Sequence, residues 1–152
     1  MQLNVPEENV FAIDKSLIED PDAAAIAYEA VLRRELGGES TVPRLDLVLL
    51  GMGPDGHTCS LFPGHVLLDE QEKLVAGIRD SPKPPPPRIT LTYKALEAAG
   101  EAAFVCAGEG KADTLRDIFH PKEGQASLPA ARVKTQQGVT WFMDKPAAAK
   151  LD

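Results

Sequence analysis

The sequence has 152 residues, of which 43% are hydrophobic and 26% are charged, and its formal net charge is −7. This length suits one domain with a sizeable core, and the acidic balance gives no electrostatic attraction to nucleic acid or to an anionic membrane surface. No apolar run has the length of a membrane span, the first residues lack the pattern of a signal peptide, and the only cysteines are Cys59 and Cys106, so we expect a cytoplasmic protein.

The N-terminal part of the sequence predicts a short strand followed by a helix. Val10–Ile13 is a short apolar run that favours a strand. Asp20 and Pro21 are typical of an N-cap and a first helical residue, and good helix formers continue to Leu36. Gly37-Gly38 then predicts the end of this helix.

The next predicted element is a strand that leads into a glycine-rich turn. Leu45–Leu50 is a continuous apolar run, which is typical of a central parallel strand buried on both faces. Gly51–Gly56 follows at once, and Pro63-Gly64 ends the segment. In α/β folds, turns at the carboxyl ends of strands carry functional residues, so this turn is the first place to look for a site.

The second half alternates between predicted strands and helices. The proline-rich segment 80–87 fits neither a helix nor an inner strand, because proline lacks an N–H donor, and it predicts an extended loop. The alternation predicts a single α/β domain over residues 1–152, with a mostly parallel, Rossmann-like sheet flanked by helices. The runs 74–78, 89–92, 102–107 and 139–143 favour strands, 93–99, 112–119 and 146–151 favour helices, and 121–127 favours a loop.

Gly51–Gly56 matches the spacing of the dinucleotide-binding fingerprint, but its context does not fit. The fingerprint requires a helix that begins at the last glycine and faces a pyrophosphate. Here Pro63-Gly64 leaves room for barely two helical turns, and no acidic residue ends a second strand at the expected distance. We therefore do not expect nucleotide binding.

Asp55 and His57 form the strongest candidate catalytic pair. An imidazole has an unperturbed pKa near neutral, so His57 could take a proton from water. A carboxylate two residues away could orient the ring or stabilise its charged form. The alternative is structural: His57 caps the turn and Asp55 bonds turn amides. Spacing alone leaves both interpretations open.

Two other chemistries would use residues of the same segment. A metal site would recruit His57, Cys59 and His65, but their spacing matches no common zinc signature and a fourth ligand is missing. Cys59 could also act as a nucleophile beside His57, although a small buried residue is the more ordinary interpretation. We expect neither a metal nor an organic cofactor.

Two basic residues lie where an anionic substrate could meet them. Gly108-Glu-Gly-Lys111 follows a predicted strand and places Lys111 in the first turn of a helix, where backbone amides and the helix dipole favour an anion. Lys111 is therefore a candidate phosphate ligand, the alternative being a solvated lysine. The proline segment is interpreted as a rigid loop that carries Arg88 toward the site, rather than as a ligand for proline-binding domains.

Together these segments resemble the 6-phosphogluconolactonase family. The resemblance is carried by Gly-Pro-Asp-Gly-His-Thr-Cys-Ser-Leu-Phe-Pro63, by Ser-Pro-Lys-Pro with Arg-Ile-Thr-Leu-Thr92, by Gly108–Ala112 and by Val139–Asp144. It covers essentially the whole chain and implies hydrolysis of 6-phospho-D-glucono-1,5-lactone without a cofactor. The resemblance also implies that this chain forms the C-terminal portion of a fold that the family shares with glucosamine-6-phosphate deaminases.

The resemblance also implies roles for individual residues. His57 would be the general base, Asp55 would orient it, Lys111 would hold the 6-phosphate, and Arg88 is a weaker candidate for the phosphate or the sugar. Gly51, Gly53 and Gly56 would let the backbone approach the substrate, with amides facing the developing oxyanion. The deaminases carry a Glu after Asp-Gly-His, whereas this chain has Ser60-Leu-Phe-Pro63 there, which argues against deamination or isomerisation.

The resemblance implies that N-terminal strand–helix units of the family are absent, with a Gly-Gly-Ser phosphate loop and an Asp-Glu-Arg stretch. We therefore expect the C-terminal portion of a lactonase, with a weakened phosphate site. We also expect an exposed apolar sheet edge that promotes self-association. The competing hypothesis is a catalytically silent fragment that acts only by binding.

Overall fold

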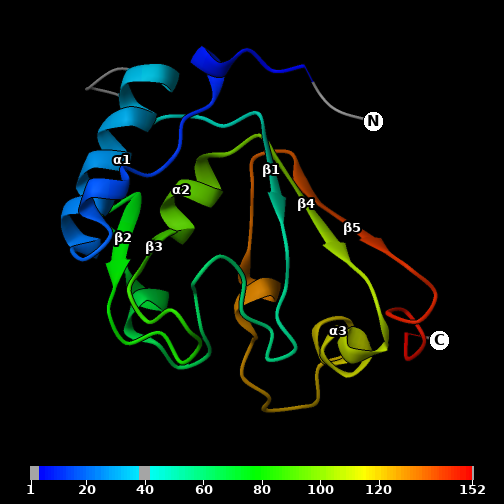
Figure 1. Ribbon diagram of the computed structural model, residues 1–152. Helices are drawn as coiled ribbons and strands as arrows, with labels where there is room; N and C mark the ends of the chain where they lie inside the picture. The colour runs from blue at the N-terminus through cyan, green and yellow to red at the C-terminus, as the bar shows by residue number, and fades with distance from the viewer. Residues whose placement is uncertain (1–3, 38–41, 152) are drawn as a thin grey trace.

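Two β-sheets organise the chain, and the computed structural model describes them within residues 4–37 and 42–151 (Figure 1). A three-stranded parallel sheet has the order β1-β4-β5, and a separate two-stranded antiparallel sheet consists of β2 and β3. The elements are α1 (Pro21–Leu36), β1 (Leu47–Leu50), β2 (Val75–Ile78), β3 (Arg88–Leu91), α2 (Tyr93–Ala98), β4 (Glu101–Cys106), α3 (Ala112–Phe119) and β5 (Gly138–Met143).

The parallel sheet confirms the α/β class that the sequence predicts. Val48 of β1 pairs with Ala102 of β4, which pairs in turn with Val139 of β5. All three strands run in the same direction, so their carboxyl ends meet at one edge of the sheet (Figure 1). The turn after β1 and the start of α3 after β4 therefore lie at the same end of the molecule.

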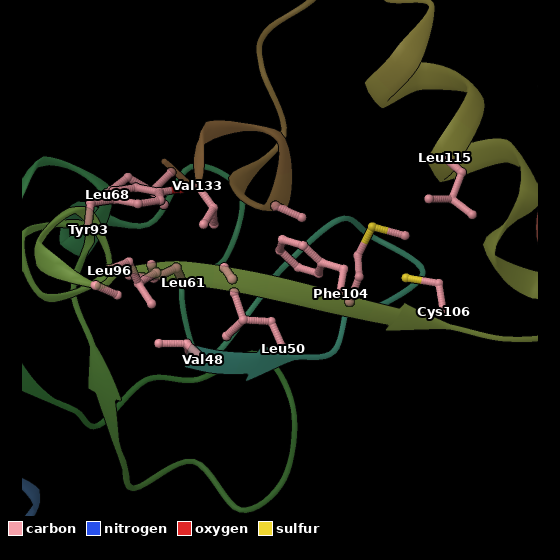
Figure 2. Close-up of a cluster of buried hydrophobic side chains, with 14 of the residues drawn as sticks. Val48, Leu50, Leu61, Leu68, Tyr93, Leu96, Phe104, Cys106, Leu115 and Val133 are labelled. Atoms are coloured by element: carbon pink, nitrogen blue, oxygen red, sulfur yellow. The ribbon is translucent and has the colours of Figure 1, made fainter. Parts of the chain in front are cut away.

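One face of the parallel sheet carries the main core. Alternate side chains of β1 and β4 point to this face, among them Val48, Leu50 and Phe104, and they pack against Leu61 and Leu115 (Figure 2). Phe104, Leu61 and Leu115 are fully buried. This packing anchors the segment that follows β1, because Leu61 lies only a few residues beyond the turn at Gly51–Gly56.

The opposite face of the same sheet is apolar and exposed. Leu49 of β1 is 71% exposed, Val105 of β4 is 60% exposed and Phe142 of β5 is 58% exposed. The prediction of a central strand buried on both faces was wrong for β1, which is an edge strand with alternating burial. The apolar run reflects the tendency of these side chains to be buried, but no described element covers this face.

β2 and β3 form a hairpin that packs against α1 instead of extending the parallel sheet. Ile78 pairs with Arg88, so the proline-rich segment 79–87 is the loop of this hairpin. The carboxylate of Glu29 on α1 accepts hydrogen bonds from the backbone amides of Leu74 and Val75 at 2.9 and 3.2 Å, which joins α1 to the start of β2. The prediction that these strands join the parallel sheet was therefore wrong.

Of the elements predicted near the two ends of the chain, the helix caps are confirmed, whereas a strand and a helix are not formed. The N-cap is confirmed, because the Asp20 carboxylate accepts from the amides of Asp22 and Ala23, and Gly37 is the C-cap of α1; Gly38 lies outside the described residues. Val10–Ile13 is not a strand, since an isolated apolar run has no partner to pair with. The helix predicted over 146–151 is not formed, since residues 146–150 form turns, because so short a segment rarely sustains a helix.

We expect the exposed face defined by Leu49, Val105 and Phe142 to drive self-association of the isolated chain, because contiguous apolar surface favours contact with a second copy. Replacing Leu49 and Val105 together by Lys should weaken association by about tenfold or more, since charges would have to be desolvated. Sedimentation over a range of concentrations measures this. Ile26→Lys, an exposed apolar position on α1, is the matched control; a wild-type chain that stays monomeric throughout would contradict the expectation.

Candidate active site

The turn after β1 is built by its own backbone. The amide of Gly53 donates to the carbonyl of His57 at 2.9 Å, and the amide of Gly56 donates to the carbonyl of Gly53 at 3.0 Å. The Thr58 hydroxyl donates to the carbonyl of Gly51 at 2.9 Å. These bonds fold residues 51–58 back on themselves and bring the side chains of Asp55 and His57 to the same side.

Asp55 and His57 are directly paired. Asp55 Oδ1 lies 2.5 Å from His57 Nδ1, and the His57 amide also faces the carboxylate at 3.4 Å. A carboxylate can only accept, so this contact requires a proton on Nδ1 and leaves Nε2 as the basic nitrogen of the neutral ring. The pair thus has the tautomer that a general base needs. The His57 side chain is 16% exposed, which keeps the ring largely shielded but within reach of solvent.

Lys83 joins this pair from the hairpin loop. Its ammonium lies 3.1 Å from Asp55 Oδ1 and 3.2 Å from His57 Nδ1. Burial, the largest single influence, raises the pKa of Asp55, but hydrogen bonds from His57 and Lys83 together lower that pKa to about 2. Asp55 is therefore an ionised carboxylate throughout the ordinary pH range. The sequence analysis missed Lys83, although a lone cation in a proline-rich segment was a visible signal.

A second layer of residues supports the pair. The Phe62 ring packs on the imidazole with its centroid 4.6 Å from that of His57, and the Arg88 guanidinium lies 5.9 Å from the Phe62 ring centroid. Arg88 donates to the carbonyls of Lys83, Pro84 and Pro85, each at 2.8 Å. Arg88 is thus near the site, as expected, but its guanidinium is bound to the loop.

The glycines of the turn differ in what they permit. A Cβ on Gly53 would overlap the His57 ring and the Asp55 carboxylate, so the pair requires glycine there. Gly56 has a φ of +79°, which favours glycine, whereas a Cβ on Gly51 would meet nothing within 4 Å. The amides of Gly53 and Gly56 are engaged within the turn. The predicted oxyanion contacts from these two amides therefore find no support in the geometry.

Lys111 lies at the predicted place, at the end of a 3₁₀ turn (Glu109–Lys111) that leads directly into α3. The Thr114 hydroxyl, in the first turn of α3, donates to the carbonyl of Pro54 at 2.5 Å, so this helix contacts the turn that carries Asp55 and His57. Lys111 and His57 are thus on the same side of the molecule, although no direct contact joins them.

The geometry does not favour a Cys59 nucleophile, a metal site or dinucleotide binding. Burial raises the pKa of the Cys59 thiol to about 11, so Cys59 is a thiol and not a thiolate at neutral pH. His65 pairs with Asp80 at 3.0 Å, away from His57. Within the described ranges, no group of three or more His, Cys, Asp and Glu side chains is arranged to hold a metal. Turns follow Gly56 where the dinucleotide fingerprint needs a helix, as the sequence analysis expected.

The protein is of the α/β class: it has a parallel sheet, and an Asp–His pair lies on the turn after the first strand of that sheet. Residues 1–142 match the family described as Glucosamine-6-phosphate isomerases/6-phosphogluconolactonase, and the chain belongs to that family. The resemblance seen in the sequence is thereby confirmed. No described helix is long and apolar enough to cross a membrane.

Relatives and solved structures agree with this assignment. The chain is 51% identical to 6-phosphogluconolactonase of Rattus norvegicus and 49% identical to that of Homo sapiens, over 99% of its own length and 57% of theirs. It superposes on the 6-phosphogluconolactonase of Thermotoga maritima with a TM-score of 0.74 and 32% identity, covering 91% of this chain and 57% of the other. For the Trypanosoma brucei enzyme the TM-score is 0.80 at 26% identity, with 97% and 63% covered. The chain thus spans little more than half the length of these relatives.

Proposed function

We propose that this chain hydrolyses 6-phospho-D-glucono-1,5-lactone to 6-phospho-D-gluconate. The observation that carries the proposal is the Asp55–His57 pair at 2.5 Å, with Nδ1 facing the carboxylate and Nε2 left as the base. The relatives named 6-phosphogluconolactonase support the same substrate. The two cysteines are free thiols, which supports a cytoplasmic setting.

In the proposed mechanism, His57 Nε2 removes a proton from a water molecule as its oxygen bonds to the lactone carbonyl carbon. The tetrahedral intermediate then collapses, the bond from that carbon to the ring oxygen breaks, and the imidazolium returns the proton to this oxygen. Asp55 stabilises the imidazolium between the two steps, and Lys83 keeps Asp55 oriented and ionised. The net reaction consumes one water and consumes no cofactor.

The direct test follows acid release from the phosphorylated lactone with the purified chain, against the spontaneous opening of the lactone. A rate above this background that requires His57 supports the proposal. A chain that binds but does not accelerate opening would instead be the silent fragment. Release of ammonia from glucosamine 6-phosphate would point to the deaminase alternative, which the absence of an acid in Ser60–Pro63 disfavours.

Lys111 is proposed to hold the 6-phosphate from the start of α3. Lys111→Met should raise KM for the phosphorylated lactone by about 10-fold or more while kcat changes little, because a charge-assisted contact to phosphate contributes about 1.5–3 kcal/mol. The unphosphorylated 1,5-lactone of gluconic acid should show no such change. Lys122→Met, an exposed lysine in the loop after α3, is the matched control. Equal losses with both lactones would contradict phosphate binding by Lys111.

A further inference from the structure

Arg88 stands at the base of the β2–β3 hairpin and directs its guanidinium into the loop. Nε donates to the carbonyl of Pro85, and Nη2 donates to the carbonyls of Lys83 and Pro84, all at 2.8 Å. Prolines cannot donate backbone hydrogen bonds, so a loop rich in proline has few donors of its own. Arg88 supplies them, and Ser81 adds a further contact, its hydroxyl bonding the amide and the carbonyl of Lys83.

These bonds hold the backbone that carries the Lys83 side chain. A lysine side chain is flexible and loses rotamer entropy when it is fixed, so a mobile backbone would make its contacts still less favourable. With its carbonyl held by Arg88, Lys83 extends 3.1 Å from Asp55 and 3.2 Å from His57. The loop is therefore the link between Arg88 and the catalytic pair.

The same guanidinium also lies near the aromatic ring that packs on the imidazole. Arg88 lies 5.9 Å from the Phe62 ring centroid, and Phe62 packs against the ring of His57. Arg88 is thus linked to the Asp55–His57 pair through the loop that carries Lys83 and through the Phe62 ring, without contacting the pair itself. A bidentate grip on phosphate uses two parallel N–H groups. Each edge of the guanidinium that could provide such a pair includes an N–H of Nη2, and Nη2 already donates to the carbonyls of Lys83 and Pro84.

We infer that Arg88 is a positioning residue that locks the hairpin loop so that Lys83 sits against Asp55 and His57, and that it is not the ligand of the substrate phosphate. The kinetic part of this inference rests on the proposed lactone hydrolysis, whereas its spectroscopic part does not. Arg88 acts on the reaction only through Lys83 and Phe62.

Arg88→Lys tests this role, because lysine keeps the charge but cannot bond three carbonyls in a fixed fork. We expect kcat to fall by about tenfold or more with both the phosphorylated and the unphosphorylated lactone, so that their ratio is unchanged. The ring resonances of His57, observed by NMR without substrate, should shift in Arg88→Lys in the same sense as in Lys83→Met. Arg79→Lys, at the other end of the loop and paired with Asp20 and Asp22, should leave both readouts unchanged.

The wild-type chain provides a second measurement that does not depend on how any variant folds. Titration with inorganic phosphate should leave the Arg88 Nε–H resonance in place, because this proton is bonded to the Pro85 carbonyl. A phosphate-dependent shift of that resonance would overturn the inference. So would an Arg88→Lys variant that raises KM for the phosphorylated lactone alone and leaves the His57 resonances unmoved. If the wild-type chain hydrolyses no lactone, the proposed function fails, yet the two NMR readouts still decide the role of Arg88.

Discussion

His57→Asn should reduce kcat/KM for the phosphorylated lactone by about 10²- to 10⁴-fold, which is the contribution typical of a positioned general base. Asparagine can still donate to Asp55 from the position of Nδ1, but it has no nitrogen at the position of Nε2 to accept a proton. The variant should therefore keep the turn and lose the chemistry. Acid release, corrected for spontaneous opening, measures the rate.

The control for this variant is His120→Asn, an exposed histidine after α3 whose Nε2 lies 3.3 Å from the carbonyl oxygen of Leu151. It should keep the wild-type rate. Thermal unfolding of both variants should remain close to that of the wild type, because the asparagine that replaces His57 keeps a donor for Asp55 and His120 is exposed. Retention of more than about a tenth of the activity by His57→Asn would show that another group is the base.

Gly53→Ala should remove activity to a similar extent without touching a reacting atom. A Cβ at this position would overlap the imidazole of His57 and the carboxylate of Asp55, so the two side chains must move apart. We expect the melting temperature to fall by an amount equivalent to about 1–3 kcal/mol, which is typical of overpacking. The His57 resonances should move away from their wild-type positions.

Gly51→Ala is the matched control within the same turn. A Cβ there would meet nothing within 4 Å, and Gly51 does not have the positive φ that restricts Gly56. This variant should retain nearly full activity and stability. If Gly53→Ala were as active as Gly51→Ala, the direct contact between Asp55 and His57 would not matter for the rate.

The contacts that could be anticipated from the sequence are local. Asp55 and His57 are two residues apart, and the glycines between β1 and Leu61 permit the backbone conformations that a tight turn requires. The helix cap at Asp20 is equally local and equally well predicted. Such contacts depend on neighbouring residues only, so residue type and spacing are enough to predict them.

The part that the sequence analysis missed depends on long-range docking. Lys83 reaches Asp55 across 28 positions of sequence, and only the pairing of Ile78 with Arg88 brings it there. A loop of nine residues rich in proline carries no short hairpin signal, so the antiparallel pairing could not be recognised. The burial of β1 was also overestimated, because burial on both faces depends on what packs against a strand and not on its own residues.

The contacts between the β2–β3 hairpin and the turn after β1 have a consequence for inactivation by heat or denaturant. The amide of Ser60 donates to the Thr90 hydroxyl of β3 at 3.0 Å, and the loop of the same hairpin delivers the ammonium to the carboxylate. The cluster of Asp55, His57 and Lys83 is thus assembled from segments attached to two sheets that have no strand in common. Warming or mild denaturant that separates the two sheets would abolish the proposed activity while the strands of each sheet were still intact. Inactivation should therefore precede the loss of secondary structure.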